Sequence, residues 1–422
     1  MDIFRQQMKR ILGASFFLGL LAAFLAFDLY LISSRSNMRR EINLINDVAG
    51  RTGVRIDAEF EEKFGPILKK HTTDLGDLFR QVTGGASGDT AVMLKQIAQR
   101  YYTLSGEQQG RFRDDSAILQ LDGAIKGRNA YYEGYDITAA GKMWLKQGRV
   151  TGAPARFISR NCTELQSRMA QIKSDGEKDT LFFPGTVYGM HGFLYGTLFG
   201  AIIMESAVLG VLVMFFAVNF EFMHGTQNLA YTSRRGRHLP ADQFRAAMLV
   251  GMFVPIFLIA AALSVFFANY HFSNVWDSFV SSGMNAEPHG MQVVPYITLR
   301  PMTTGEYLRA NIGLVLVLQA VFCLLAFSVA IYCRNNYVGF LGYALGWMMS
   351  VNLPSVLPWN TVLPLILTAN PVIAWVDCGN WLTQIDIFDA SPWYFPAIFL
   401  LGASLAAIAA FFGVRRFRRA DL

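Results

Sequence analysis

The sequence predicts an all-α integral membrane protein with six transmembrane helices and a large, mainly helical extracytoplasmic domain inserted between helices one and two. Hydrophobic residues make up 53% of the 422-residue chain and 34 residues are Phe, which is too apolar for a soluble globule. Charged residues make up 16%, which is too many for a chain that lies wholly in lipid. The chain must therefore combine a membrane part with a part exposed to water.

Six apolar runs are long enough to cross a hydrocarbon core that is about 30 Å thick. The first, residues 11–32, follows Lys9 and Arg10 as the core of a secretory signal would, but it is longer than such a core. We therefore expect a retained transmembrane helix there, preceded by an amphipathic interfacial helix at residues 1–10. The other five runs are 193–218, 247–268, 312–333, 337–353 and 394–414.

A seventh apolar run, residues 356–376, is not expected to cross. It contains Pro358, Pro364 and Pro371, and each proline removes a backbone donor and disrupts a helix. A crossing here would also place the basic tail, RRFRRADL, on the opposite side from the other basic segments. We predict a re-entrant or interfacial helical hairpin on the outer face.

The basic residues indicate the orientation. With six crossings, four basic segments share one side, which the positive-inside rule assigns to the cytoplasm. They are residues 1–10, the loop 219–246, the turn at Arg334 and the C-terminal tail. The connection 377–393, which carries Asp but no Lys or Arg, falls outside. We expect both termini in the cytoplasm and place this multi-pass protein in a bacterial cell membrane.

The stretch 34–186 then lies outside, because long loops translocate regardless of their charge. Apolar residues recur there at helical spacing, as at Phe60, Phe64 and Leu68, and glycine-rich breaks divide the stretch. We predict a mainly helical extracytoplasmic domain. A second outer segment, 269–310, carries prolines and glycines that favour an ordered loop packed on this domain.

Motifs for catalysis or for energy coupling by the chain itself do not occur in the sequence. There is no GxxxxGK[ST] loop, and the closest glycine cluster, GGASGD, lacks the lysine that binds phosphate. No GxSxG or HExxH occurs, and the four Cys show no metal-ligand spacing. We predict a protein that is not an enzyme, binds no cofactor or metal directly and has no nucleic-acid partner. Whether the two outer cysteines, Cys162 and Cys378, pair is left open.

The most informative segment is the predicted cytoplasmic loop, residues 219–246. After an acid come a Gly-Thr pair, a short amphipathic stretch, a Ser with basic residues and a new helix that starts near Pro240. In order and spacing this loop resembles the coupling loop of the membrane subunits of type-2 ABC exporters. The matching positions are Glu221, Gly225, Thr226, Ser233 and Arg234.

The resemblance implies that a short coupling helix sits in a groove of a separate ATPase. The segment from Tyr231 to Arg237, which includes Arg235, would contribute to this contact. The simpler interpretation of the same basic cluster is a positive-inside stop signal with no partner. We favour coupling because the insert is longer than a topological signal needs.

The same family accounts for the six spans, the amphipathic N-terminal segment, the broken hairpin between spans five and six, and the tail FRRADL. It implies a permease subunit that exports an amphipathic or hydrophobic substrate, such as a peptide, a drug or a lipid-like compound. Such a subunit works in membrane lipid with a second permease copy and an ABC ATPase subunit that holds ATP and Mg²⁺. The outer domain is large for the family and would gate the exit or meet an extracytoplasmic partner.

Two acids fall within the membrane runs, Asp28 near the outer end of the first and Glu205 near the middle of the second. An ionised acid at mid-bilayer costs about 2.5 to 3.5 kcal/mol on insertion scales, so such residues usually face a cavity, a partner helix or a protonation site. Both are candidates for the transport path. The simpler interpretation is a protonated or hydrogen-bonded packing residue for Glu205, and an acid that reaches water for Asp28. No second acid is expected at the depth of Glu205.

Two other classes of function stay open. A membrane sensor or assembly factor would bind a ligand with its outer domain, contact a signalling partner through the basic loop and have no transport activity. An intramembrane enzyme that used Glu205 and Asp28 would need the two acids at one depth. An ATPase with a Walker motif encoded next to this chain would favour the exporter.

Overall fold

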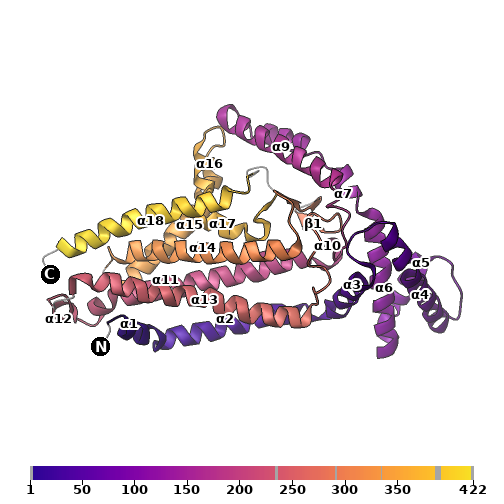
Figure 1. Cartoon of the computed structure of the whole chain (residues 1–422), viewed down its shortest axis with the longest axis horizontal. Coiled ribbons are helices and arrows are strands. Elements are labelled where there is room, and N and C mark those ends of the chain that lie inside the picture. Colours follow the sequence, from indigo (N-terminus) through magenta and orange to yellow (C-terminus); the bar gives the residue numbers. More distant parts are fainter. Residues whose placement is uncertain (1–2, 233–235, 290–291, 334, 385–390, 420–422) are drawn as a thin grey trace.

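The computed structural model describes residues 3–232, 236–289, 292–333, 335–384 and 391–419, and it is 77% helical. Long helices form a bundle at one end of an elongated molecule, and shorter helices form a domain at the other end (Figure 1). Both ends of the chain lie at the end of the bundle away from this domain. The helical content and the long apolar helices are those of an all-α membrane protein, as the sequence predicts.

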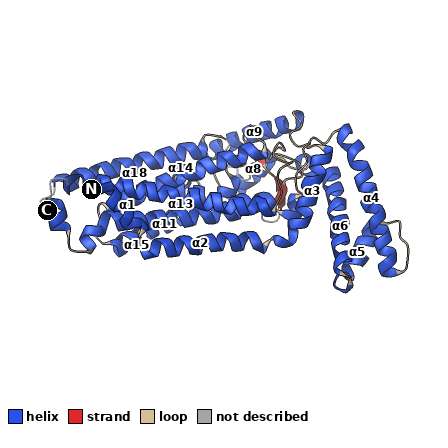
Figure 2. Cartoon of the chain, turned by 60° about the horizontal axis from the view of Figure 1, so that its bottom comes forward, coloured by secondary structure: helices blue, strands red, loops and turns tan. Residues whose placement is uncertain are grey.

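Five helices of the described chain are long and apolar enough to cross a membrane. They are α2 (Ser15–Ser34), the continuous helix of η3 (Gly192–Leu198) and α11 (Phe199–Met223), α13 (Leu239–Asn269), α14 (Thr304–Ala330) and α18 (Tyr394–Arg419). A further helix, α15 (Asn336–Val356), runs lengthwise in the bundle against α11 and α14 (Figure 2). The structure thus supports several membrane passes, and the predicted count of six depends on α15.

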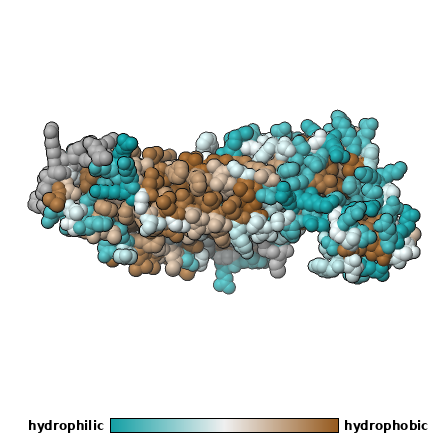
Figure 3. Space-filling view, turned by 90° about the horizontal axis from the view of Figure 1, so that it is seen from below, coloured by the Kyte–Doolittle hydropathy of each residue, from teal (hydrophilic) through white to brown (hydrophobic). Residues whose placement is uncertain are grey.

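Helix α11 is the centre of the bundle. In its most apolar stretch 72% of the residues are buried, against 22% for α2 and 28% for α18. The side chains that the peripheral helices leave exposed form a hydrophobic band along the bundle, bounded by hydrophilic surface at both ends (Figure 3). In water this band would be a large apolar patch, whereas in a bilayer it contacts lipid.

Small residues let α11, α13 and α14 approach one another closely. A Cβ on Gly210 would lie 2.5 Å from Nε2 of Gln319, and a Cβ on Gly251 would lie 2.8 Å from Sγ of Cys323. Gln319 uses this close approach, because its Nε2 donates to the backbone carbonyls of Ser206 at 2.9 Å and Gly251 at 3.1 Å. Small residues and hydrogen bonds between helices are the usual means by which membrane helices associate.

The N-terminal segment forms a short helix, α1 (Ile3–Leu12), which is separated from α2 by a break at Gly13 and Ala14. Its apolar face is held against the bundle, where Ile11 and Gln7 are buried, and its main neighbour is α13. Lys9 and Arg10 lie in its last turn, where cations interact favourably with the helix dipole. The segment is therefore a short helix set off from α2 by a break, and its interfacial position stays a prediction.

The inserted domain follows α2 and consists of helices with well-defined starts. Asp57, Asp89 and Asp136 each accept hydrogen bonds from first-turn amides, and Ser105 forms a capping box with Gln108. The elements are η1 (Ser36–Met38), α3 (Arg39–Thr52), α4 (Ala58–Thr83), α5 (Thr90–Gln99), η2 (Tyr101–Thr103), α6 (Gly106–Gly127), α7 (Ala130–Glu133), α8 (Ile137–Gln147), α9 (Gly152–Ser174) and α10 (Gly185–Tyr188).

Two small cores stabilise the distal parts of this domain. The first, around Leu78, Ile97 and Phe112, joins α4, α5 and α6. The second, around Ile158 and Leu165, joins α8 to α9. Helix α3 belongs instead to the main core, which runs on into the bundle. The domain is thus continuous with the bundle at its base and has its own cores further out.

The segment between α13 and α14 connects the bundle to the inserted domain through buried hydrogen bonds. Ser281 Oγ donates to Glu177 at 2.7 Å, Arg168 donates to the same carboxylate at 2.7 Å, and Arg168 also donates to the carbonyl of Thr298 at 2.8 Å. These groups are buried and come from three separate stretches of chain. The segment contains β1 (Ala286–His289), which pairs with β2 (Gln292–Pro295), and β3 (Ile297–Thr298), which pairs with β4 (Thr383–Gln384). It is the ordered, domain-contacting segment expected for 269–310.

The proline-rich run 356–376 forms two helices of six residues each, α16 (Leu363–Thr368) and α17 (Pro371–Val376), too short to cross a bilayer. The short element η5 (Cys378–Asn380) follows and brings Sγ of Cys378 3.4 Å from the carbonyl of Tyr195. Cys162 lies in α9 against Gly141 of α8. All four cysteines are free, so Cys162 and Cys378 do not pair.

Candidate functional site

The loop that joins α11 to α13 forms a compact turn at the end of the bundle where the chain termini lie (Figure 1). Helix α11 ends at Met223, and Gly225 adopts a left-handed conformation with φ of 67°, which glycine tolerates best. The amide of Thr226 then donates to the carbonyl of Glu221 at 2.9 Å. This turn directs the chain into the short helix α12 (Gln227–Thr232).

Glu221 does not face solvent, because its side chain links three helices. Its Oε1 accepts from Nη1 of Arg10 on α1 at 3.0 Å, and its Oε2 accepts from Nε2 of Gln243 on α13 at 2.7 Å. Glu221 is buried, and the guanidinium of Arg10 also covers the ring of Phe220 at 4.4 Å. Sequence reasoning identified Glu221 but missed Arg10 and Gln243, which lie 211 and 22 residues away along the chain.

Helix α12 lies beyond this buried link, with Asn228 and Leu229 exposed and Gln227 and Ala230 half-buried. Leu229, on α12, is 79% exposed. Tyr231 lies in α12 and Arg237 in the following short element η4 (Gly236–His238). Ser233, Arg234 and Arg235 lie outside the described residues. The structure therefore places the described members, Glu221, Gly225, Thr226, Tyr231 and Arg237, at one short loop at the end of the bundle.

The two membrane acids lie together, so the expectation that Glu205 has no second acid at its depth is wrong. The carboxyl groups of Asp28 on α2 and Glu205 on α11 face each other closely enough to interact, without a hydrogen bond of good geometry. The positions of the two acids in their apolar runs gave no sign of this, because Asp28 lies near the outer end of its run and Glu205 near the middle of its own. The structure thus brings both sequence-predicted acids into one site.

This acid pair is buried without a counter-charge. Asp28 is 0% and Glu205 is 5% exposed, and none of their four carboxyl oxygens has a hydrogen-bond partner within the described part of the chain. Two ionised carboxylates so placed would repel each other in a medium of low polarity. At least one of them must hold a proton or face a bound cation. The pair can therefore change its charge when a proton or a cation arrives.

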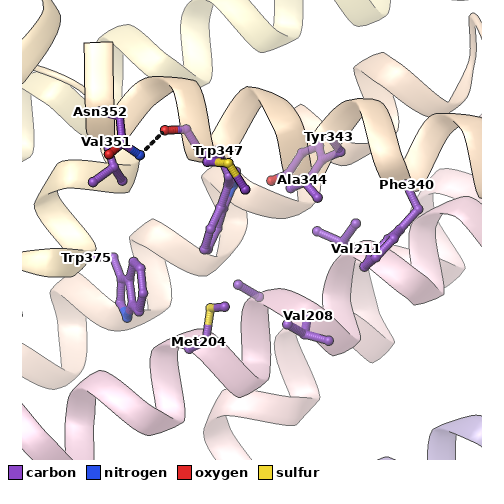
Figure 4. A pocket seen from close by; sticks show the side chains of 12 residues that line it. Met204, Val208, Val211, Phe340, Tyr343, Ala344, Trp347, Val351, Asn352 and Trp375 are labelled. Carbon is purple, nitrogen blue, oxygen red and sulfur yellow. Dashed lines mark hydrogen bonds between the residues drawn. The ribbon is translucent and has the colours of Figure 1, made fainter. Parts of the chain in front are cut away.

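An apolar groove lies on a different face of α11. Its volume is about 350 Å³, and it is open to the surface between α11, α15 and α17 (Figure 4). The amide of Asn352, one of the lining side chains, is engaged within its own helix, since Nδ2 donates to the carbonyl of Met348 at 2.8 Å. The lining residues are Met204, Ala207, Val208, Val211, Phe340, Tyr343, Ala344, Trp347, Met348, Val351, Asn352 and Trp375.

A buried polar cluster at the junction of bundle and domain was not foreseen. The ring of His191 lies 3.9 Å from the ring of Tyr296, and its Nε2 lies 3.3 Å from the carbonyl oxygen of Gly379. Glu287 accepts from the amide of Gly192 at 3.1 Å. Burial lowers the pKa of His191 to about 3 and raises the pKa of Glu287. The residues come from three distant segments, so no local sequence pattern marks this cluster.

Comparison with known proteins finds no matching family model, no matching curated protein and no matching solved structure. The class that the fold defines is a multi-pass helical membrane protein. Its function has to be argued from the loop, the acid pair and the groove.

Proposed function

We propose that this chain is the permease subunit of an ABC exporter. A separate ATPase subunit binds ATP and Mg²⁺, and this chain moves an amphipathic or hydrophobic substrate, such as a peptide, a drug or a lipid-like compound, out of the cytoplasm. The observation that carries the proposal is the loop: α12 presents Leu229 to solvent, while Glu221 ties the base of the loop to α1 and α13. A short helix that is exposed at its tip and fixed at its base can transmit the movement of an attached ATPase to the bundle.

The proposed topology has six crossings, with α15 as the fifth. Its exposed apolar side chains, among them Leu341, Leu345 and Met348, support a position against lipid. With this count, both termini and α12 share the cytoplasmic side of a cell membrane, and the inserted domain lies outside. The permease acts as a homo- or heterodimer, and the outer domain gates the exit or binds an extracytoplasmic partner.

The groove and the acid pair are the proposed substrate path. A volume of about 350 Å³ falls in the range of small-ligand sites, and an apolar lining suits a hydrophobic substrate. Because both sites lie on α11, a tilt of this helix would change the groove and the environment of Glu205 together. Protonation of the acid pair would then accompany transport.

The second candidate is a membrane sensor or assembly factor without transport activity. The size of the domain between α2 and η3 favours it, because a domain with cores of its own can bind a ligand independently of the bundle. This candidate requires no ATPase at α12. The two candidates therefore differ in what is attached to the loop.

Isolation of the tagged chain from its native membranes in mild detergent tests the proposal. The exporter predicts co-purification of an ATPase with a Walker motif, and loss of that ATPase when residues 231–237 are replaced by a Gly/Ser linker. A control replaces residues 84–88, in the loop between α4 and α5, with a Gly/Ser linker of the same length as that stretch. Stable isolation of the chain without an ATPase would overturn the exporter and leave the sensor.

A further inference from the structure

Helices α4 and α6 of the inserted domain bring three potential metal ligands together, far from the loop and the acid pair. His71 and Asp74 are three residues apart on α4 and therefore share one face of that helix. Asp115 projects from the neighbouring helix α6. One ligand atom from each of the three side chains lies within 4.8 Å of the other two.

Asp115 is the unusual member of this group. Its side chain is only 3% exposed, and its Oδ1 lies 2.7 Å from Nδ1 of His71. Its second oxygen, Oδ2, is buried and has no hydrogen-bond partner among the described residues. A buried carboxylate oxygen without a partner is costly, and native proteins usually satisfy such an atom with a donor, a water molecule or a metal ion.

A simple ion pair between His71 and Asp115 explains only part of this geometry. It accounts for the 2.7 Å contact between Nδ1 and Oδ1, but it leaves Oδ2 unsatisfied and gives no reason for the carboxylate of Asp74 to lie in the same cluster. Neither aspartate forms a salt bridge with a Lys or Arg in the described ranges. Two carboxylates and one imidazole together carry an excess of negative charge, which a divalent cation would balance.

We propose that His71, Asp74 and Asp115 bind a divalent transition-metal ion of the Zn²⁺ type. One imidazole nitrogen and two carboxylate oxygens form the mixed donor set that Zn²⁺ accepts, whereas Mg²⁺ and Ca²⁺ favour oxygen ligands alone. In a tetrahedral site with bonds of about 2.0 to 2.2 Å, neighbouring ligand atoms lie roughly 3.3 to 3.6 Å apart. Rotation of side chains brings the three atoms to this spacing, and water fills the fourth position.

The bound ion fixes α4 to α6 in the distal part of the domain. These helices also meet through the small core around Leu78, Ile97 and Phe112, and nearer the bundle both contribute to the main core. A cross-link by metal would therefore add rigidity to a part of the chain whose apolar core is small. The site is independent of the proposed transport function, because it lies outside the bundle.

The test uses the full chain in detergent, with a histidine-free tag, after treatment with a chelator and removal of the chelator. Zn²⁺ binding is measured by calorimetry and by metal analysis after gel filtration, and Co²⁺ serves as a spectroscopic probe of the ligand geometry. We expect one Zn²⁺ per chain, a tetrahedral Co²⁺ absorption band and a higher melting temperature of the inserted domain. Asp74→Asn should weaken Zn²⁺ binding by about tenfold or more, and His71→Gln should abolish the Co²⁺ band.

The matched control is Asp77→Asn, which changes an exposed acid on the next turn of α4 and should leave Zn²⁺ binding unchanged. Asp115 is buried, and a variant such as Asp115→Asn that fails to fold says nothing about metal binding. Asp74 is only partly buried, so Asp74→Asn is the informative substitution. Absence of stoichiometric Zn²⁺ in the wild-type chain would overturn the proposal. Equal Zn²⁺ affinity in the wild type and in the His71→Gln, Asp74→Asn double variant would overturn it as well.

Discussion

Nη1 of Arg10 lies 3.0 Å from Oε1 of Glu221, although 211 residues separate them in the chain. This contact joins the N-terminal helix α1 to the end of α11, at the point where the exposed loop leaves the bundle. Gln243 binds the other oxygen of the same carboxylate from α13 at 2.7 Å. Glu221 therefore joins α1, α11 and α13 at the base of the loop.

Removal of the Glu221 carboxylate should weaken the contact of α1 with α11 and should uncouple the loop from the bundle. Glu221→Ala is expected to lower the free energy of unfolding by about 1.5 to 3 kcal/mol, the usual contribution of hydrogen bonds that involve charged groups. ATP hydrolysis by the isolated complex should fall while the ATPase stays bound. Lys9→Ala, at an exposed neighbour of Arg10, is the control and should change neither quantity. Unchanged stability and hydrolysis in Glu221→Ala would show that the link has no coupling role.

Neutralising the acid pair should reduce transport without impairing folding. Asp28→Asn and Glu205→Gln keep the shape of each side chain but cannot ionise, so membrane insertion and melting temperature should be maintained or raised, because a buried acid is replaced by a neutral amide. ATP-driven accumulation of a lipophilic dye in inside-out vesicles should decrease several-fold.

Ser206→Ala is the control for the acid pair, since Ser206 is a buried polar neighbour that carries no charge. It should transport the dye like the wild type. Normal accumulation in both acid variants would mean that Asp28 and Glu205 are packing residues.

Helix α15 should depend on one glycine for its contact with α11. A Cβ on Gly339 would clash with the ring of Phe215 on α11, so Gly339→Ala should destabilise the bundle by about 1 to 3 kcal/mol. Gly342 lies one turn further along α15 with open space around it, and Gly342→Ala should be neutral or stabilising by up to about 1 kcal/mol. Thermal unfolding in detergent measures both. Equal melting temperatures in the two variants would contradict the packing of α15 described above.

The junction between bundle and domain should weaken in acid through His191. Burial lowers the pKa of His191 to about 3 in the folded protein, from 6.5 in an unfolded chain. The neutral ring therefore contributes its full stability above pH 6.5, and this contribution is lost as the pH falls from 6.5 towards 3, by about 1.4 kcal/mol for each pH unit.

A comparison of melting temperatures between pH 7.5 and pH 4.5 checks that stability falls on acidification. His191→Gln removes the titrating ring, so its melting temperature should fall less on acidification than that of the wild type. His271→Gln, at an exposed histidine, should follow the wild type. A parallel decline in all three proteins would exclude His191 as the cause.

Much of the bundle could be predicted from the sequence because each long helix is a continuous apolar run. The break at Gly13, the six-residue helices at 363–368 and 371–376, and the glycine turn at Gly225 follow local rules that short stretches of sequence carry. Helix α15 shows the limit of this reasoning. Its run has the length to cross, but it is not among the five helices that are long and apolar enough, so the count of six stays a prediction.

The functional contacts could not be predicted because they join residues far apart in the chain. Nothing near Glu221 indicates that Arg10 and Gln243 bind it, and nothing near Asp28 indicates that it lies opposite Glu205. His71, Asp74 and Asp115 show the same limit, since the first two share a helix but the third comes from α6. Local patterns predict helices, whereas sites arise where the helices meet.

The most direct test of the proposed function is a photo-reactive residue at position 229 in native membranes. Leu229 is 79% exposed on α12, and Leu345, 48% exposed on α15, provides the matched position within the apolar band. We expect the probe at 229 to cross-link to an ATPase with a Walker motif, and the probe at 345 not to. Cross-links from position 229 only to lipid or to another copy of this chain would contradict it.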